Sequence, residues 1–138
     1  MTPVSPQHPQ LAVSAAIFRD DKLLLVRRAR VPAKGVYTLP GGRVEFGETL
    51  HQALRREVEE ETGLVIDIVG LAGWREVLPE TAGGGHFVIL PFAARWRSGE
   101  VRLNGELDDF RWLAADALGG LTLTAGLPEI VAAAQRLL

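Results

Sequence analysis

The chain of 138 residues contains no cysteine. Without a thiol it has no disulfide, no thiolate zinc site and no cysteine nucleophile, a composition that fits a cytoplasmic protein. No apolar run approaches the roughly 18 residues that a membrane-spanning helix needs. The first ten residues, MTPVSPQHPQ, contain three prolines and no basic segment followed by an apolar run. We therefore expect neither a signal peptide nor a membrane as a partner.

An excess of charge of either sign is also missing. The 15 Lys and Arg nearly balance the 17 Asp and Glu, for a formal net charge of -2. This balance gives no general attraction to nucleic acid, which we do not expect as a partner. The hydrophobic content of 47% is ordinary, and the length is most simply that of one domain. We expect a flexible N-terminal tail over residues 1–9 and a single domain over 10–138.

The chain does contain alternating strand and helix patterns. Strands are expected near residues 11–18, 22–28, 36–39, 64–78, 86–97, 100–103 and 108–113, and helices over 48–62, 114–118 and 127–138. The helix over 48–62 is rich in glutamate, and Gly63 is placed to end it. Gly41 and Gly42 predict a tight turn before this acidic helix. Strands interleaved with helices indicate an α/β sandwich, in which helices cover both faces of one sheet.

The acidic helix carries the densest charge, in the stretch REVEEETG at 56–63. At 3.6 residues per turn, Glu57 and Glu61 fall on the apolar face of the helix, Glu60 falls at its edge, and Glu59 faces water. A solvated charged face explains Glu59 but not the other three, because a carboxylate near a buried seam must be paired, protonated or bound to metal.

Two explanations remain open at this point. Arg55 and Arg56 could neutralise one or two of the three carboxylates. Alternatively, the three carboxylates converge as hard oxygen ligands, of the kind that Mg²⁺ and Mn²⁺ prefer.

Residues upstream of the helix extend this pattern into a motif. Read from Gly42, the sequence is Gly, five residues, Glu48, seven residues, REV, one residue, EE, one residue, then Gly and Leu64. This resembles the signature of the Nudix hydrolases at every defined position across 23 residues. The signature, residues 42–64, is called the box below, and the acidic helix within it is the box helix. The resemblance, MutT-like or ADP-ribose pyrophosphatase-like, implies a Nudix-type α/β/α sandwich with a central mixed sheet and the box helix on one face.

The resemblance also implies a chemistry. Such enzymes use Mg²⁺ or Mn²⁺ to hydrolyse the pyrophosphate bond of a nucleoside diphosphate linked to another moiety. The matching metal ligands are Glu57, Glu60 and Glu61, with a backbone carbonyl at Gly42 as a further ligand. Arg56 is expected to orient a box carboxylate through a charge-assisted hydrogen bond, and so is grouped with Glu57 and Glu60 as catalytic.

Several glutamates are candidates for supporting roles. Glu48 is expected to start the helix, where its charge suits the dipole, and to reach a metal through water. Glu57 is the first choice for the general base or for a metal ligand adjacent to it. Relatives also use an acidic residue from a later loop, for which Glu106 and Glu80 are candidates, although each could be a plain surface glutamate.

The identity of the substrate depends on weaker signals. Pro79 lies 15 positions after Leu64, a spacing that resembles ADP-ribose pyrophosphatases. A basic patch before the motif, formed by Arg27, Arg28, Arg30 and Lys34, could bind phosphates or could equally be ordinary surface charge. Arg28 and Arg30 are its candidates for substrate binding. Trp74, Phe87 and Trp96 could stack on a base, but aromatic residues in strands are more often part of the core.

Two kinds of function follow. The favoured one is hydrolysis of ADP-ribose or a nucleotide sugar, with a house-cleaning (d)NTP pyrophosphohydrolase as the alternative. The other is a catalytically silent module that binds a nucleotide and regulates. The three intact carboxylates favour an enzyme, because a silent site has no use for mutually repelling charges. A homodimer, common among the relatives, is kept open.

Overall fold

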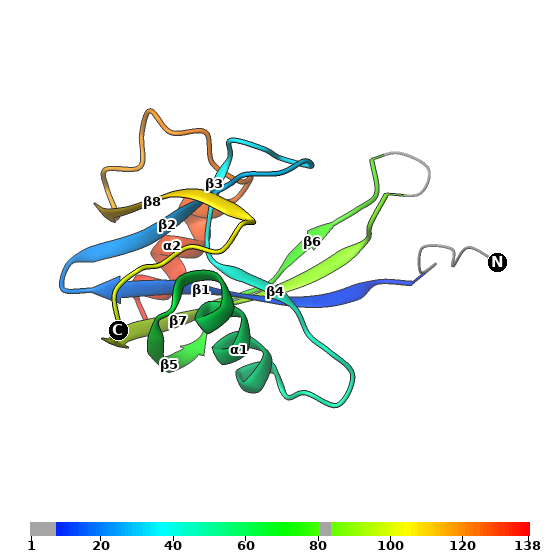
Figure 1. Ribbon diagram of the computed structural model, residues 1–138, viewed down its shortest axis with the longest axis horizontal. Coiled ribbons are helices and arrows are strands. Elements are labelled where there is room, and N and C mark those ends of the chain that lie inside the picture. The colour runs from blue at the N-terminus through cyan, green and yellow to red at the C-terminus, as the bar shows by residue number, and fades with distance from the viewer. Residues whose placement is uncertain (1–7, 81–83) are drawn as a thin grey trace.

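The structure is a computed structural model that describes residues 8–80 and 84–138. One mixed sheet forms the centre, with a helix on either side of it (Figure 1). The elements are β1 (Gln10–Arg19), β2 (Lys22–Arg28), β3 (Tyr37–Thr38), β4 (Gly41–Arg43), α1 (Leu50–Thr62), β5 (Val65–Leu71), β6 (Arg75–Val77), β7 (Phe87–Ser98), β8 (Leu107–Ala114) and α2 (Leu127–Gln135). The α/β sandwich expected from the alternating patterns is confirmed.

Strand β1 organises the sheet. It pairs in parallel with β7 along most of its length, and antiparallel with β4 near its start and with β2 near its end. The β6 strand pairs only with the first part of β7, so β6, β7 and the start of β1 extend beyond the two helices as an arm (Figure 1). This arm provides a surface that neither helix fully covers.

Two apolar clusters hold the helices on opposite faces of the sheet. On one face, Ala53, Leu54 and Val58 of α1 pack into a cluster with alternate residues of β1, β2 and β7. On the other face, Leu127 and Val131 of α2 pack against the remaining alternate residues of the same strands. The two-residue period of a strand explains this division, because successive side chains point to opposite faces.

Local signals fix both ends of α1. The Thr49 hydroxyl accepts a hydrogen bond from the Gln52 amide, and the Gln52 side chain accepts one from the Thr49 amide, which forms a capping box. Gly63 has a φ of 75° and ends the helix, as expected. Glu48 therefore lies before the N-cap, and the prediction that it starts the helix is wrong, because the Thr49–Gln52 pair provides the stronger start.

The Gly41–Gly42 pair was expected to form a turn but lies in a strand. Gly42 pairs with Val13 and Gly41 with Ser14 in the ladder between β4 and β1. A Cβ atom on Gly41 would lie 2.1 Å from the Val13 carbonyl oxygen. The glycines therefore allow a close approach of two backbones rather than a tight turn.

Two expected short elements are absent from the described part of the chain. Residues 114–118 form a turn instead of a helix, because Ala114 still belongs to β8 and the remainder is too short to nucleate a helix. Residues 100–103 form no strand. Instead, the amides of Arg102 and Asn104 donate to the carbonyls of Thr62 and Glu61, at 2.8 and 3.4 Å, and satisfy the last carbonyls of α1.

Other expectations concern the N-terminus and the length of apolar segments. Of the tail expected over 1–9, only residues 8 and 9 are described, and β1 begins at Gln10; residues 1–7 lie outside the described residues. No helix in the described residues is long and apolar enough to cross a membrane. The long strand expected over 64–78 is divided into β5 and β6.

Candidate active site

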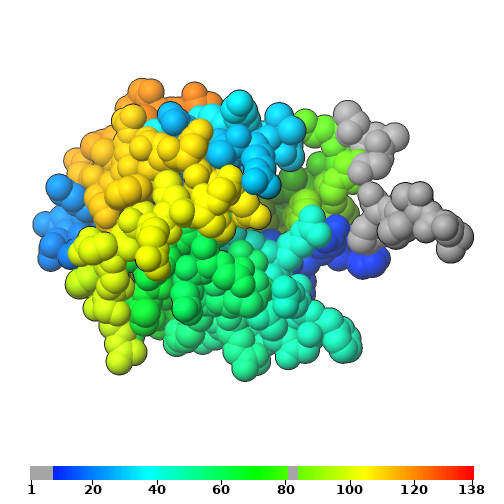
Figure 2. Space-filling view, viewed as in Figure 1, coloured from blue at the N-terminus to red at the C-terminus, as the bar shows by residue number. Residues whose placement is uncertain are grey.

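A cavity of about 1180 Å³ lies along the α2 face of the arm and reaches the edge of α1 at β4. In Figure 2 the surface is hollowed between the cyan segment that precedes β3 and the green β6 strand. The floor of the cavity comes from β1, β6 and β7, and its walls come from α1, from the segment after β2, and from the start of α2. Its volume exceeds the usual size of a small-molecule pocket, so it has room for more than a diphosphate.

Two carboxylates of α1 reach the cavity past β4. Glu61 is only 7% exposed, and its Oε1 accepts a hydrogen bond of 2.8 Å from the Gly41 amide. The Glu57 carboxylate lies directly over Gly42, where a Cβ atom would be 2.3 Å from its Cδ. The missing side chains of β4 thus leave the space through which α1 presents both acids.

The electrostatics of these acids show crowding. Burial raises the pKa of Glu61 to about 7, helped by the nearby charges of Glu57 and Glu106 and opposed by the Gly41 hydrogen bond. Burial also raises the pKa of Glu57, with further increases from Glu60 and Glu106, while Arg56 opposes the shift. Raised pKa values caused by burial and like charges are typical of functional sites.

The Arg56 guanidinium makes hydrogen bonds to Glu48, Glu57 and Glu60. Its Nε and Nη2 donate to the two carboxylate oxygens of Glu48, each at 2.8 Å, and its Nη1 donates to Glu57 Oε1 at 2.8 Å. A longer contact of 3.4 Å joins Nη1 to Glu60, and Nη2 also donates to the Arg43 carbonyl. The bond from Arg56 lowers the pKa of Glu48 to about 2. The expected contact between Arg56 and a box carboxylate is therefore present. Glu48, in the loop before α1, accepts two further hydrogen bonds from Arg56.

Glu60 is less buried than the helical wheel implied. Its side chain is 57% exposed, against 16% for Glu57, and it is absent from the described lining of the cavity. As a residue at the edge of the apolar face, it turns toward water and Arg56. Glu59 is exposed, as expected.

The later acidic candidates separate clearly. Glu106 lines the cavity opposite α1, and its carbonyl accepts a hydrogen bond of 2.9 Å from the Ala29 amide. Glu80 and Pro79 are exposed beyond β6 and are not among the described residues that line the cavity. Val77 and Gly84, which flank this segment, do line the cavity, so Glu80 as a base and Pro79 as a substrate contact stay predictions.

The basic patch divides in a similar way. Arg28 and Arg30 both line the cavity, where Arg28 also donates to the Pro32 carbonyl at 3.0 Å. Arg27 points to the other side of its strand and pairs with Asp108 at 2.6 Å. Successive side chains of β2 point to opposite faces of the sheet, so Arg28 lines the cavity and Arg27 does not.

The aromatic candidates have three different environments. Phe87 lines the cavity, Trp74 is 70% exposed, and Trp96 packs against the Arg19 guanidinium at 3.8 Å from its ring centre. Only Phe87 remains a candidate for contact with a base.

The donor set fits a divalent metal in its chemistry. Glu57, Glu61 and Glu106 bring carboxylate oxygens, the donor type that Mg²⁺ and Mn²⁺ prefer, to one cavity, and burial together with like charge raises the pKa of the two α1 acids. Within residues 8–80 and 84–138, no group of three or more His, Asp or Glu side chains is already arranged to hold an ion. Arg56 occupies part of the Glu57 carboxylate instead. Bound cations would offset the repulsion among these acids.

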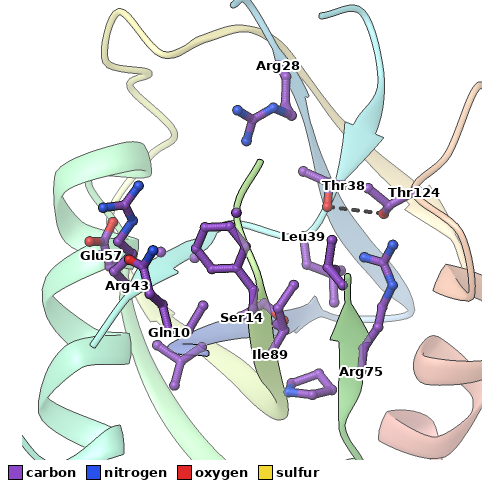
Figure 3. Close-up of a pocket in the computed structure, with 18 of the residues that line it drawn as sticks. Gln10, Ser14, Arg28, Thr38, Leu39, Arg43, Glu57, Arg75, Ile89 and Thr124 are labelled. Atoms are coloured by element: carbon purple, nitrogen blue, oxygen red, sulfur yellow. Dashed lines mark hydrogen bonds between the residues drawn. The ribbon is translucent and has the colours of Figure 1, made fainter. Parts of the chain in front are cut away.

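Sequence reasoning missed the far end of the cavity. Thr38, Arg75 and Thr124 line it, on the side opposite Glu57 in Figure 3, and Ser14, also missed, lines the cavity beside Gly41 of β4. No motif contains them. Ser14 alone gave a signal, as a hydroxyl inside the otherwise apolar run of β1.

Comparisons with known proteins agree with this geometry. The family model of the NUDIX domain matches residues 8–134. An ADP-ribose pyrophosphatase of Methanocaldococcus jannaschii is 40% identical over 95 residues, which cover 69% of this chain and 56% of that protein. The NAD-capped RNA hydrolase NudC of Pseudomonas aeruginosa is 37% identical over 119 residues, covering 81% of this chain and 39% of that protein. The chain thus spans about half or less of the length of these relatives.

A solved structure extends the match to nearly a whole protein. The MutT NUDIX hydrolase of Burkholderia pseudomallei superposes with a TM-score of 0.81 at 32% identity, covering 91% of this chain and 98% of that one. The family model alone matches well over half of the chain. The chain belongs to the NUDIX family and is a MutT-like member of it.

Proposed function

We propose that this protein is a divalent-metal-dependent pyrophosphohydrolase that acts on a nucleoside diphosphate linked to another moiety, with ADP-ribose or a nucleotide sugar as the favoured substrates. The observation that carries the proposal is the placement of Glu57 and Glu61 at one end of a large cavity, over strand glycines that leave room for them. The relatives named for ADP-ribose and for NAD-capped RNA support the same substrate class.

Charge complementarity supports a diphosphate as the bound group. Arg28 and Arg30 line the cavity near Glu106, on the wall that faces α1. Guanidinium groups bind phosphate oxygens in a bidentate manner. In this proposal, the arginines hold the diphosphate while the acids of α1 hold the cation side of the site.

Glu57, Glu60 and Glu61 would hold Mg²⁺ or Mn²⁺, with the Gly42 carbonyl as a proposed further ligand. When bound, such an ion neutralises charge on the phosphate oxygens and lowers the pKa of water. The residues of this chain provide the remainder. Arg56 fixes the Glu57 carboxylate, and Gly42 leaves the space that the carboxylate needs.

Glu57 is the proposed general base. Its pKa is raised by burial, which makes its carboxylate a better proton acceptor than an exposed glutamate. Glu106 is the alternative base, because it lines the same cavity and its charge affects both Glu57 and Glu61. Either residue would take a proton from the attacking water.

A panel of substrates tests the proposal. Purified protein is assayed with Mg²⁺ or Mn²⁺ against ADP-ribose, nucleotide sugars, NAD, NAD-capped RNA and (d)NTPs. We expect hydrolysis of a diphosphate-linked compound to exceed that of every (d)NTP. Preference for a (d)NTP would favour the house-cleaning alternative. Tight binding of one compound without hydrolysis of any would favour the regulatory module.

A further inference from the structure

Arg75 is a cationic side chain of the cavity that the proposed chemistry does not use. It begins β6, is half-buried, and lines the cavity. Among the residues that the structure describes, it forms no ion pair and no side-chain hydrogen bond. Its neighbour Glu76 points to the other face of the strand, as the two-residue period requires. The guanidinium has five N–H donors and no acceptor, so a ligand with acceptor atoms in this cavity could bind it.

Strand register fixes how far Arg75 lies from the acids. Arg75 pairs with Ile89, Ile89 with Ala12, and Ala12 with Arg43, in one row across β6, β7, β1 and β4. Three strand spacings separate the ends of this row, or about 14 Å. The glutamates of α1 lie at the β4 end. A diphosphate held there needs an attached moiety to reach Arg75.

Two hydroxyl groups lie at the same end. The Thr124 hydroxyl donates to the Thr38 hydroxyl at 3.2 Å, which leaves the proton of Thr38 free to donate outward. Figure 3 shows this pair on the same side of the cavity as Arg75, with Glu57 on the opposite side. This end therefore offers several donors to a ligand.

Carboxylates are confined to the other end of the cavity. The glutamates among its described lining residues are Glu45, Glu57, Glu61 and Glu106. None of them belongs to β3, β6, β7 or α2, which form the end around Arg75. Apolar side chains surround Arg75 there instead, with Ile89 directly opposite on β7 and Ile130 on α2. Apolar lining residues beside several donors suit a ring with acceptor oxygens.

We infer that Arg75, with the Thr38–Thr124 pair, binds acceptor oxygens on the moiety of the substrate that lies furthest from the metal-binding acids. Two sources share this chemistry: the keto edge of an oxo base such as guanine or uracil, and an additional phosphate. Guanine presents two adjacent acceptors to a guanidinium, whereas adenine places an amino donor beside its ring acceptor. This inference rests on the proposed function and narrows its substrate class.

Binding of nucleotides that contain no anhydride bond tests the inference apart from turnover. The affinities of GMP, UMP, AMP and adenosine 2′,5′-bisphosphate are measured by calorimetry, with Mg²⁺ present, for the wild type and for Arg75→Gln. We expect the wild type to bind GMP or UMP, or else the bisphosphate, about tenfold or more tightly than AMP. Arg75→Gln should lose that preference while AMP binds as before.

Three further variants sharpen the result. Arg75→Lys keeps the charge but not the fork, so it should retain preference for the bisphosphate and lose preference for an oxo base. Thr38→Val should weaken the preferred ligand by a smaller factor. Arg95→Gln, an exposed arginine of β7 outside the cavity, is the matched control and should bind every ligand as the wild type does.

Equal affinity of the wild type for all four nucleotides would overturn the inference, as would a preference that survives in a folded Arg75→Gln. Thermal melts confirm folding, and Arg75→Lys provides the second test if Arg75→Gln is unstable. Turnover of diphosphate compounds is measured separately. Hydrolysis with no effect of Arg75 refutes this inference alone, whereas absence of hydrolysis with intact nucleotide preference refutes only the proposed enzyme.

Discussion

The carboxylate of Glu57 occupies the space that a side chain on Gly42 would need. A Cβ atom on Gly42 would lie 2.3 Å from Glu57 Cδ and 2.4 Å from its Oε2. The helix residue and the strand residue are 15 positions apart in the sequence, and both belong to the signature motif. This contact gives the glycine a role that a turn would not, because it places the acid.

Gly42→Ala should therefore displace Glu57 while the sheet remains folded. We expect turnover to fall by about tenfold or more, since misplacement of a catalytic group by an ångström is costly. Steady-state kinetics on the best diphosphate substrate measure the loss. Gly119→Ala is the matched control, because a Cβ atom there meets no atom within 4 Å. Equal activity of the two variants would contradict the steric role of Gly42.

The four glutamates of α1 should differ in effect. Glu57→Gln and Glu60→Gln should each lower turnover by about tenfold or more, through loss of a charge that binds metal or accepts a proton. Glu59→Gln, on the exposed side of the same helix, should retain full turnover. All three proteins should melt within a few degrees of the wild type. Unchanged rates in both Glu57→Gln and Glu60→Gln would refute the assignment of the site.

Glu61 predicts a pH dependence of the metal-free protein. Its pKa rises from 4.5 to about 7 on folding, so the folded state binds the proton more tightly than the unfolded state. Stability is then greatest below pH 4.5 for this group and declines as the pH rises through 7. Glu61→Gln should remove this decline and stabilise the metal-free protein at pH 8 by up to about 3 kcal/mol.

Urea unfolding in the presence of a chelator, at pH 5 and pH 8, measures this difference. Glu59→Gln provides the comparison, because it removes the same charge from an exposed position of the helix. If Glu61→Gln gains no more stability at pH 8 than at pH 5, then burial does not set the pKa of Glu61.

Divalent metal should stabilise the wild type more than its variants. A ligand that binds only the folded state raises its stability by about 2.7 kcal/mol at a concentration 100 times its Kd. We expect Mg²⁺ or Mn²⁺ to raise the Tm of the wild type and to have a much smaller effect on Glu57→Gln. Calorimetric scans with and without metal provide the measurement, with Ca²⁺-free chelated buffer as the baseline. An equal shift in both proteins would place the metal elsewhere.

The role of Arg56 should depend on the several N–H donors of its planar guanidinium as well as on its charge. Its Nε and both Nη atoms donate to acids, with two bonds to Glu48 and one to Glu57. Arg56→Lys keeps the charge but cannot make all three bonds, so we expect kcat to fall by about tenfold with a smaller change in KM. Arg55→Lys, at an exposed position, should behave as the wild type. A fall in Tm with unchanged kcat would show a structural role alone.

The sequence predicted those parts of the protein that local spacing determines. The strands of the β1–β2 hairpin and the exposure of Glu59 follow from periods of two and 3.6 residues. The end of α1 follows from the position of Gly63 after the last helical residue. The helical wheel also placed Glu57 and Glu61 on the packed face, but it could not show that Glu60 turns outward. The spacing of residues along a helix does not determine the rotamer of a side chain at the edge of the buried face.

Pairings between distant segments were beyond the sequence. Gly41 and Gly42 were interpreted from their conformational freedom, whereas their partner strand explains them. Arg75 and Thr124 line the same cavity although they are 49 positions apart in the sequence. Pro79 was interpreted from a spacing in relatives, and it is not among the described residues that line the cavity.

The amides of Arg102 and Asn104 are bound to the last carbonyls of α1, and Glu106 follows two residues later. Glu61, whose own carbonyl is one of these acceptors, and Glu106 are thus tethered through main-chain atoms that every residue except proline provides. A substrate that draws Glu106 inward must also pull on the end of the helix. The gap between these two acids is therefore set by the length of a short backbone span, and insertion of one residue between 104 and 106 would change it more than any exchange of side chains.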